Sequence, residues 1–160
     1  MLKDIELINF IDLNLDEKKM VLSWRNDESI KDWMYNQEDI SLENHLAFIE
    51  SLKSSKDKLY FLLRKDNTDL GVIDFTNICE ESVHMGLYIK PKEKGLGRLF
   101  METIVSYSFE VLKVEKIIAE VYSENQRAYE LYKKMGFVNF DEKEVNKREV
   151  KCLELKNENR

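Results

Sequence analysis

Three short runs rich in apolar residues, at 59–65, 70–78 and 82–90, predict β-strands. The third alternates apolar and polar positions with a period of two. The first two flank Asp66-Asn67-Thr68-Asp69, a segment typical of a tight turn, so we expect a hairpin there. In the third run, one face of the strand carries Val83, Met85, Leu87 and Ile89, and the other carries His84, Gly86, Tyr88 and Lys90.

A helical period replaces the strand period after Gly95-Leu96-Gly97. Apolar residues then recur every three or four positions, as on a helix packed against a sheet: Leu96, Phe100, Ile104, Tyr107 and Val111. Similar patterns predict one or two helices in 16–36, a helix capped by Ser41, and a helix at 125–135 ending at Gly136. Further strands are predicted at 5–10, 116–122 and 150–155. This order predicts an α/β (α+β) fold, a single domain over 1–160 with a mostly antiparallel first half.

Composition narrows the classes of partner. The 160 residues carry a formal net charge of −6, so the molecule as a whole does not attract nucleic acid or anionic membranes. The apolar runs are far shorter than a membrane span, and the N-terminus lacks the layout of a signal peptide. We therefore expect a cytoplasmic protein with no nucleic-acid or membrane partner; the pattern does not indicate an oligomeric state.

Cysteine and histidine spacing gives no metal-site pattern. Cys79 and Cys152 are expected to be small apolar fillers on strands, and His45 and His84 lie far apart in the sequence. No metal is predicted.

Gly95 and Gly97 lie between a predicted strand and the first turn of a predicted helix. Such a pair serves either as a tight turn or as an anion site, because the first N–H groups of a helix lack internal partners. Lys94 and Arg98 add positive charge nearby. The spacing lacks both the Gly-Lys-Ser/Thr of a Walker loop and the third glycine of a dinucleotide fingerprint, so the pair by itself leaves both interpretations open.

A second motif, N-x-x-A-x-x-x-Y-x-x-x-G-F, runs from Asn125 to Phe137 and places Asn125, Ala128 and Tyr132 on one helical stripe. By itself it also fits a capped helix with a core tyrosine. Together with Lys92-Glu93-Lys94-Gly95-Leu96-Gly97 it resembles the GNAT (Gcn5-related) N-acetyltransferase superfamily, whose phosphate loop is Q/R-x-x-G-x-G/A. One departure is that Lys92 follows Pro91 directly, which shortens the loop and puts a role for the Lys92 side chain in doubt.

The resemblance implies a mixed, largely antiparallel twisted sheet with helices on both faces and a splayed strand pair that holds acetyl-CoA. It assigns 58–155 to the cofactor core and 1–57 to the acceptor side. Asn125 would hydrogen-bond the cofactor arm near the thioester, and Tyr132 would protonate the departing thiolate. The implied cofactor contacts, with the arm along the strand and the pyrophosphate on the loop, are Leu87, Tyr88, Ile89, Lys94, Gly95, Leu96, Gly97, Arg98 and Leu99. A side chain at Gly97 is expected to obstruct this phosphate cradle.

The base that deprotonates the acceptor amine is left open. Glu120 is one candidate, by its place five residues before Asn125, although strand glutamates are usually solvated. His84 titrates in a suitable range, although a lone histidine is more often structural; Glu124 is a weaker option. Since no Cys–His nucleophile pair is evident, direct transfer in a ternary complex is predicted.

The acceptor is predicted from weaker family features, among them "WRN", "GVIDFTNI" and "GLYIKP". They resemble the GNAT branch that acetylates the 4-amino group of a UDP-linked amino-dideoxy sugar in pseudaminic acid (flagellin glycan) biosynthesis. Such an amino-sugar nucleotide calls for cations and aromatic faces, which Trp24, Arg25 and His45, with Trp33, could supply; core packing is the alternative for both tryptophans. A protein or ribosomal-protein N-terminal acetyltransferase and a catalytically silent acetyl-CoA-binding module are the other functions considered.

Overall fold

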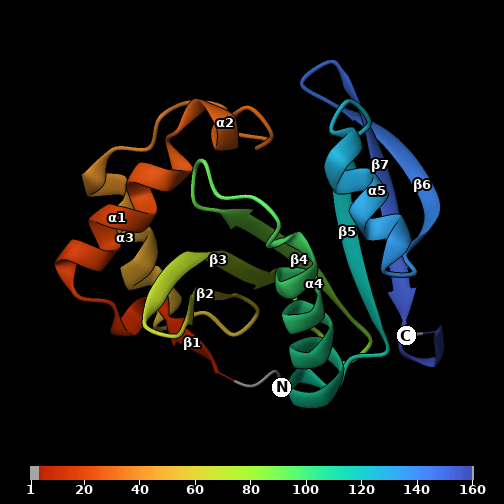
Figure 1. The fold of residues 1–160 in the computed structure, drawn as a ribbon, viewed down its shortest axis with the longest axis horizontal. Helices are drawn as coiled ribbons and strands as arrows, with labels where there is room; N and C mark the ends of the chain where they lie inside the picture. The colour runs from red at the N-terminus through yellow and green to blue at the C-terminus, as the bar shows by residue number, and fades with distance from the viewer. Residues whose placement is uncertain (1–3, 160) are drawn as a thin grey trace.

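The computed structural model describes residues 4–159, so residues 1–3 and 160 of the predicted domain lie outside the described part. Seven strands form one sheet in the order β1-β2-β3-β4-β5-β7-β6 (Figure 1). The pair β4–β5 is parallel and the other neighbouring pairs are antiparallel. The strands are β1 Ile5–Asn9, β2 Leu59–Lys65, β3 Thr68–Thr76, β4 Ser82–Ile89, β5 Lys116–Tyr122, β6 Val138–Val145 and β7 Arg148–Lys156.

Within residues 4–159, five α-helices and two short η segments connect these strands, and a third η segment follows β7. The helices are α1 Leu15–Arg25, α2 Glu28–Lys31, α3 Leu42–Leu52, α4 Gly97–Ser106 and α5 Gln126–Lys134. The η segments are η1 Phe10–Asp12, η2 Tyr107–Leu112 and η3 Asn157–Asn159. The caps follow the sequence: Ser41 Oγ accepts the Asn44 N–H at the start of α3, as predicted, and Asn14 with Glu17 forms a capping box on α1.

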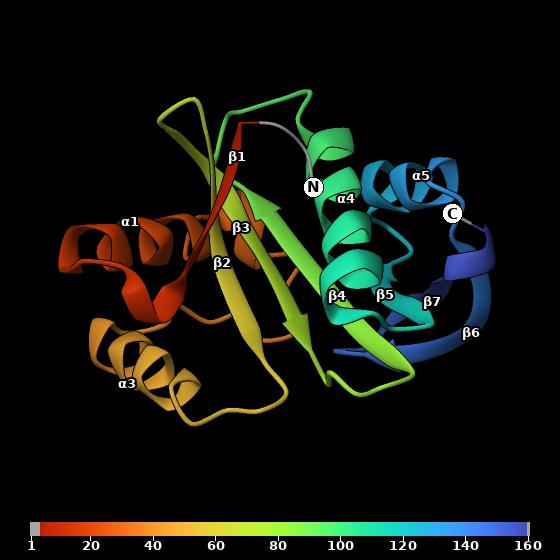
Figure 2. The same cartoon turned by 90° about the horizontal axis from the view of Figure 1, so that it is seen from below.

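The sheet has a hydrophobic core on each face. On one face Phe61, Ile73 and Phe75 pack against α4, and α5 adds Tyr132 to the same cluster. On the other face Leu62 and Val72 pack against η1, α1 and α3. Figure 2 shows α1 and α3 on one side of β2 and β3, with α4 on the other. The mixed, largely antiparallel sheet with helices on both faces, predicted from the sequence, is confirmed.

The predicted helix after the glycine pair departs from its pattern at its C-terminal end. Phe100 and Ile104 are fully buried as expected, whereas Val111 is 51% exposed. The reason is that η2 is a π-helical turn, whose wider spacing rotates the residues after Ser106. Ser108 and Phe109 therefore face inwards in place of Val111.

The two cysteines take different positions. Cys152 is buried on β7, as expected. Cys79 is exposed and lies after the end of β3, so the prediction of a buried strand filler is wrong there. Its thiol donates to the carbonyl oxygen of Ser82, the first residue of β4 (3.5 Å), and the contacts with Ser82 lower the pKa of the thiol.

Gly71 lets the first turn of α4 approach β3. A Cβ on this residue would lie 2.4 Å from the Tyr88 carbonyl oxygen and 2.8 Å from the Phe100 ring. Phe100 therefore occupies the space that a side chain at 71 would need. This contact fixes the start of α4 above the sheet. Within residues 4–159, no helix combines the length and hydrophobicity needed to cross a bilayer.

Candidate active site

β4 and β5 separate after three residue pairs. Their parallel pairing runs from Ser82–Lys116 to His84–Ile118, while β4 continues to Ile89 and β5 to Tyr122. In Figure 1 the two strands lie together at the lower end and diverge towards the top. A cavity of about 310 Å³ opens where they part, lined by both strands, by the start of α5 and by the segment after α2. The splayed pair predicted from the sequence is thus present.

Beyond the branch point, β4 keeps a partner on one edge alone. Leu87 and Ile89 pair with Ile73 and Gly71 of β3, and no pairing with β5 extends past His84. Leu87, Tyr88 and Ile89 line the cavity. A strand with one open edge can bind an extended ligand through its peptide groups. This geometry suits the predicted contact of these three residues with the pantetheine arm.

The start of α4 offers unpaired peptide N–H groups. Leu96 is the N-cap and makes no side-chain capping bond, and the first helical hydrogen bond runs from the Phe100 N–H to Leu96. Among the described residues, no acceptor pairs with the N–H groups of residues 94–99. Lys94 and Arg98 are exposed beside them, although Arg98 also pairs with Glu102 at 2.9 Å. The loop has the features of an anion cradle.

The two glycines of this loop differ in what they do. Gly95 has a φ of +79°, and a Cβ built on it would meet no atom within 4 Å. Gly97 opens α4 close to α5, and its Cβ would lie 2.8 Å from Leu131 Cδ2. The missing side chain of Gly97 thus makes room for α5, and the positive φ of Gly95 provides the turn of the loop. Obstruction of the phosphate cradle by a side chain at Gly97 stays a prediction. Lys92 also has a positive φ, of 72°, as part of the shortened connection.

We expect Gly95→Ala to weaken coenzyme A binding about 5- to 30-fold, because a left-handed conformation costs a residue with a Cβ about 1–2 kcal/mol. Gly95 is exposed, so the free loop can relax and the cost falls on the bound state. Titration calorimetry with coenzyme A measures it. Gly136→Ala is the matched control, since Gly136 has a φ of +98° at the end of α5, away from the loop. That variant should lose stability and keep its affinity; equal losses of affinity in both would contradict the cradle.

Tyr132 lies on α5 with its side chain in the cavity. The residue is 8% exposed, and its hydroxyl has no hydrogen-bond partner among the described residues. Burial, and then the charge of Asp74, raise the pKa of Tyr132 to about 12. The phenol therefore stays protonated at neutral pH and is free to donate to a ligand atom. This is the requirement for the general-acid role predicted for it.

Asn125 has two functions available to its side chain. Its Oδ1 caps α5 by accepting the Ala128 N–H at 3.4 Å. Its Nδ2 has no partner among residues 4–159, and the residue lines the cavity. The amide nitrogen is thus the group that could hydrogen-bond the cofactor arm.

Glu120 faces the cavity but is already engaged. Its carboxylate accepts hydrogen bonds from the Tyr35 hydroxyl at 2.5 Å and from Lys143 Nζ at 3.0 Å. Burial raises the pKa of Glu120. The hydrogen bonds from Lys143 and Tyr35 lower it by more than burial raises it, so the pKa lies below its usual value. A carboxylate with a lowered pKa is a weak proton acceptor, so the geometry disfavours the predicted base role.

His84 and Glu124, the other predicted bases, lie outside this cavity. His84 lines a neighbouring hollow beside Glu120, Lys143 and Thr76. Glu124 is exposed and accepts a hydrogen bond from Arg148 Nε at 2.8 Å. Neither carries a contact that points to proton transfer in the cavity.

Asp74 is a cavity residue that the sequence predictions missed. It lies within β3 and lines the cavity with Gly86 and Tyr88. Burial raises the pKa of its carboxyl to about 7. A signal was present in the sequence, because an aspartate in the middle of the apolar strand "GVIDF" is unusual.

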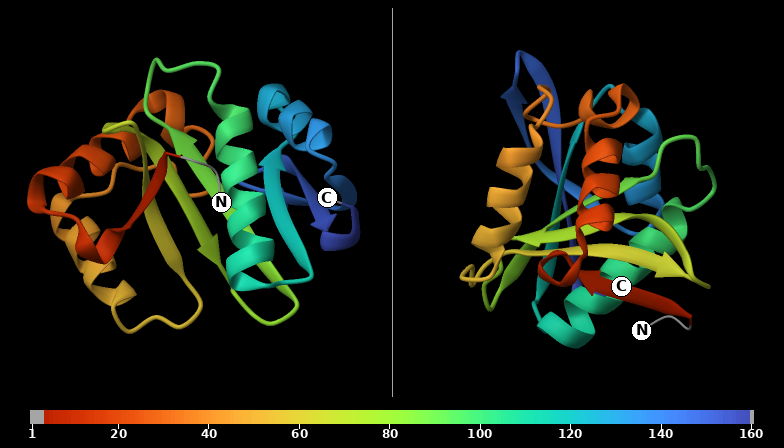
Figure 3. Two further views of the ribbon diagram at one scale, coloured as in Figure 1. Left: turned by 60° about the horizontal axis from the view of Figure 1, so that its bottom comes forward. Right: turned by 90° about the vertical axis from the view of Figure 1, so that its left-hand side faces the viewer.

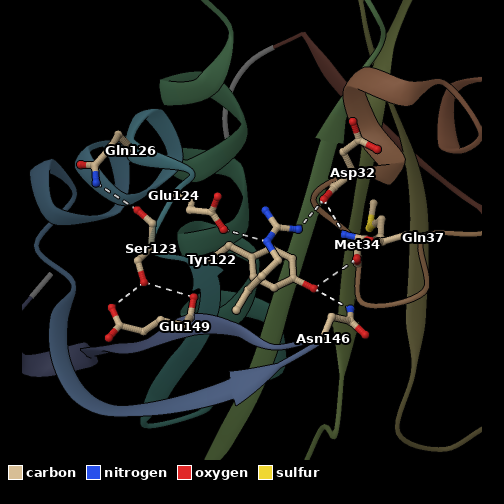
Figure 4. A network of polar contacts seen from close by, with 10 residues as sticks. Asp32, Met34, Gln37, Tyr122, Ser123, Glu124, Gln126, Asn146 and Glu149 are labelled. Carbon is tan, nitrogen blue, oxygen red and sulfur yellow. Dashed lines mark hydrogen bonds and ion pairs between the residues drawn. The ribbon is translucent and has the colours of Figure 1, made fainter.

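The segment after α2 forms one wall of the cavity and is held by the β6–β7 hairpin. Tyr122 of β5 is central: its hydroxyl donates to the Met34 carbonyl (3.4 Å) and accepts from Asn146 Nδ2 at 2.9 Å (Figure 4). Arg148 stacks on the Tyr122 ring at 3.8 Å and donates to the Asp32 carbonyl oxygen. Figure 3 shows the hairpin tip beside this segment in the right-hand view. Trp33 and Tyr35 are thereby presented at the cavity, 41% and 43% exposed.

Trp24, Arg25 and His45, predicted to contact the acceptor, do not line this cavity. Trp24 packs on the core beneath α1, and His45 Nε2 donates to the Lys18 carbonyl oxygen at 2.9 Å. Arg25 is 9% exposed and donates to the Asn36 carbonyl oxygen, which ties the wall segment to α1. Its Nη1 has no hydrogen-bond partner among the residues that the structure describes. Their predicted binding roles have no support from this geometry.

Within residues 4–159, no cluster of three or more His, Cys, Asp or Glu side chains is arranged to hold a metal ion.

Among the described residues, the site combines a splayed parallel strand pair, helix N–H groups without an acceptor after β4, and a buried phenol without a hydrogen-bond partner. These features define the site of an acyl-CoA-dependent acetyltransferase. The sequence matches the family model "Acetyltransferase (GNAT) domain" over residues 8–138, and the chain belongs to this family. It is 41% identical over 138 residues to the acetyltransferase PseH of Campylobacter jejuni serotype O:2, covering 86% of this chain and 87% of the relative. PseH of serotype O:23/36 matches equally.

Solved structures agree with this assignment. The C. jejuni N-acetyltransferase PseH in complex with acetyl coenzyme A superposes with a TM-score of 0.81 at 36% identity, covering 96% of this chain and 99% of the other. Spermidine N-acetyltransferase from Vibrio cholerae has a TM-score of 0.87 at 19% identity, which shows the shared fold alone; 99% of this chain and 98% of that one are covered. The predicted GNAT family, an acetyl-CoA-dependent N-acetyltransferase activity and the resemblance to the acetyltransferase of pseudaminic acid biosynthesis are confirmed.

Proposed function

We propose that this protein transfers the acetyl group of acetyl-CoA to the 4-amino group of a UDP-linked amino-dideoxy sugar in pseudaminic acid biosynthesis. The carrying observation is the 41% identity to PseH over 86% of the chain, together with a cavity that joins the open edge of β4 to an aromatic wall. We also propose that the reaction takes place in the cytoplasm, where both nucleotide-linked substrates are present.

The wall of the cavity supports a nucleotide-linked acceptor. Trp33 and Tyr35 expose aromatic faces, and Arg148 and Lys143 lie 5.4 and 5.8 Å from their respective ring centroids. Aromatic faces suit the uracil ring and cations suit the pyrophosphate. The acceptor-side role predicted for residues 1–57 would thus rest on the segment after α2, with β6 and β7 supplying the cations.

The chain's own groups support direct transfer in a ternary complex. The unpaired N–H groups at the start of α4 would hold the pyrophosphate of the cofactor, and β4 would align its arm. Tyr132 would donate a proton to the sulfur as the thioester bond breaks. No cysteine lines the cavity, so the cavity lining offers no thiol for an acetyl-enzyme intermediate.

The acceptor assignment is tested by measuring thiol release from acetyl-CoA with matched acceptors. We expect release with the UDP-4-amino-4,6-dideoxy sugar, and none with UDP-N-acetylglucosamine, which carries UDP but no free amine. Peptides and spermidine should also give none. Release with peptides alone would establish an N-terminal acetyltransferase instead. Binding of acetyl-CoA without release by any amine would indicate a silent binding module.

A further inference from the structure

Asp74 places a carboxylate directly over the strand that opens into the cavity. In the β3–β4 register Asp74 pairs with Gly86, two residues beyond His84, the last residue of β4 paired with β5. A Cβ on Gly86 would lie 2.5 Å from Asp74 Oδ2 and 2.7 Å from Oδ1. The absence of that Cβ lets the carboxylate lie against β4 at the branch point, beside the residues predicted to align the cofactor arm.

This carboxylate has no hydrogen bond or ion pair among the described residues. The other carboxylate of the cavity, Glu120, is bound to Lys143 and Tyr35. A half-buried carboxylate without a partner is costly to keep ionised. It is therefore well suited to accept a proton, and burial raises its pKa to about 7.

Asp74 and Tyr132 enter the cavity from opposite faces of the sheet. Tyr132 belongs to the core on the α4 and α5 face, whereas Asp74 alternates with Ile73 and Phe75, which are part of that core. Asp74 therefore shares the α1 and α3 face with Val72. Acyl transfer needs a proton acceptor at the attacking nitrogen and a proton donor at the departing sulfur, which are two different atoms bonded to the same carbon in the tetrahedral intermediate. The through-sheet arrangement provides a proton donor on one side and a proton acceptor on the other.

We propose that Asp74 is the general base that removes a proton from the acceptor ammonium before it attacks the thioester. The carboxylate takes one proton from R–NH₃⁺, leaving R–NH₂ and a neutral Asp74. The amine nitrogen then bonds to the carbonyl carbon, the C–S bond breaks, and the departing sulfur takes the Tyr132 proton. The amide nitrogen returns its surplus proton to the Tyr132 phenolate, and Asp74 releases its own proton to water. The products are the amide, coenzyme A and one proton.

Other titratable groups surround Asp74 and must be separated from it. Tyr60 from β2 and Tyr88 from β4 face it, with pKa values raised by burial first and by the Asp74 charge second. Tyr132 approaches from α5, and Arg25 from α1 lies near Tyr88. His84 and Glu120 lie on the same sheet face beside Asp74. Of these, His84 and Glu120 are the bases predicted from the sequence, so the test includes a variant of each.

The test is the pH dependence of kcat/KM for the UDP-4-amino sugar in wild type, Asp74→Asn, His84→Gln and Glu120→Gln. This inference rests on the proposed function; failure of wild type to acetylate that sugar would refute the function, whereas the variants test the base. In wild type the rate should rise with pH and level off above about 7, because the base acts when ionised. In Asp74→Asn, kcat/KM should fall by about 100-fold or more at pH 7 and should no longer rise with pH below 7. The KM for acetyl-CoA should stay within two-fold of the wild-type value.

The controls distinguish a proton acceptor from a structural residue. Asp66→Asn makes the same change in the exposed turn of the β2–β3 hairpin and should match wild type. Gly86→Ala should displace the carboxylate and reduce the rate as Asp74→Asn does.

A raised pKa of Asp74 also means that its ionisation destabilises the folded protein as pH rises from about 4 to 7. The Tm of Asp74→Asn relative to wild type should accordingly increase over that range. The proposal would be overturned if kcat/KM still rose towards pH 7 in Asp74→Asn. It would also be overturned if this rise disappeared in His84→Gln or Glu120→Gln.

Discussion

Tyr132→Phe is expected to lower kcat by about 100-fold or more while the affinity for acetyl-CoA stays within two-fold. The substitution removes one hydroxyl that lies in the cavity and has no hydrogen-bond partner in the described part of the chain. The ring would keep its contact with Phe137 in the core, so the fold should not suffer. Steady-state kinetics with the UDP-4-amino sugar, together with calorimetric titration of acetyl-CoA, separate turnover from binding.

The neighbouring tyrosine of α5 supplies a matched control for this prediction. The Tyr129 hydroxyl accepts a hydrogen bond from Asn139 Nδ2 at 2.9 Å and does not line the cavity. Tyr129→Phe should lose about 1 kcal/mol of stability and leave kcat unchanged. Because the pKa of Tyr132 is about 12, the wild-type rate should also show no decline between pH 8 and 10. Normal turnover in Tyr132→Phe would remove this residue from the acid role.

Phe100→Ala should reduce the free energy of unfolding by about 3–5 kcal/mol, a large share of the about 5–15 kcal/mol that holds a domain folded. The ring is fully buried and fills the space above Gly71, where β3 and the first turn of α4 meet. A cavity there cannot close easily, since the Tyr88 carbonyl group and the sheet backbone surround it. Urea denaturation monitored by circular dichroism measures the loss.

This prediction also has a functional consequence. Phe100 anchors the helix whose first N–H groups form the anion cradle, so residual folded protein should bind coenzyme A more weakly. Val111→Ala, in the continuation of the same helix, removes a side chain that is 51% exposed and should change stability by no more than about 0.5 kcal/mol. A loss below about 1 kcal/mol in Phe100→Ala would contradict the packing role of this contact.

Local sequence patterns predicted most of the elements because their causes are local. The three short apolar runs became β2, β3 and β4, and Asp66 and Asn67 take the positive φ values that their turn requires. The two motifs at 92–97 and 125–137 were sufficient to predict the family. The exposure of Val111 could not be predicted. A single π-helical turn changes which residues face the core, and it is too short to leave a recognisable pattern in the sequence.

The sequence by itself determined the order of the elements up to the last helix, the family, and Tyr132 and Asn125 as cavity residues, because these follow from local periodicity and short motifs. It placed a strand at 150–155 and missed β6, Val138–Val145, most of whose side chains are exposed. Tertiary structure alone decided which polar side chains stay free. Glu120 gained Lys143 and Tyr35 from distant segments and ceased to be a good base, whereas Asp74 met a glycine across the strand and kept its carboxylate unpaired. In the same way, only the tertiary structure showed that Gly97 lies against Leu131 of α5. These contacting residues lie far apart in the sequence and meet only when the sheet and helices pack together. No local sequence pattern can therefore predict their contacts.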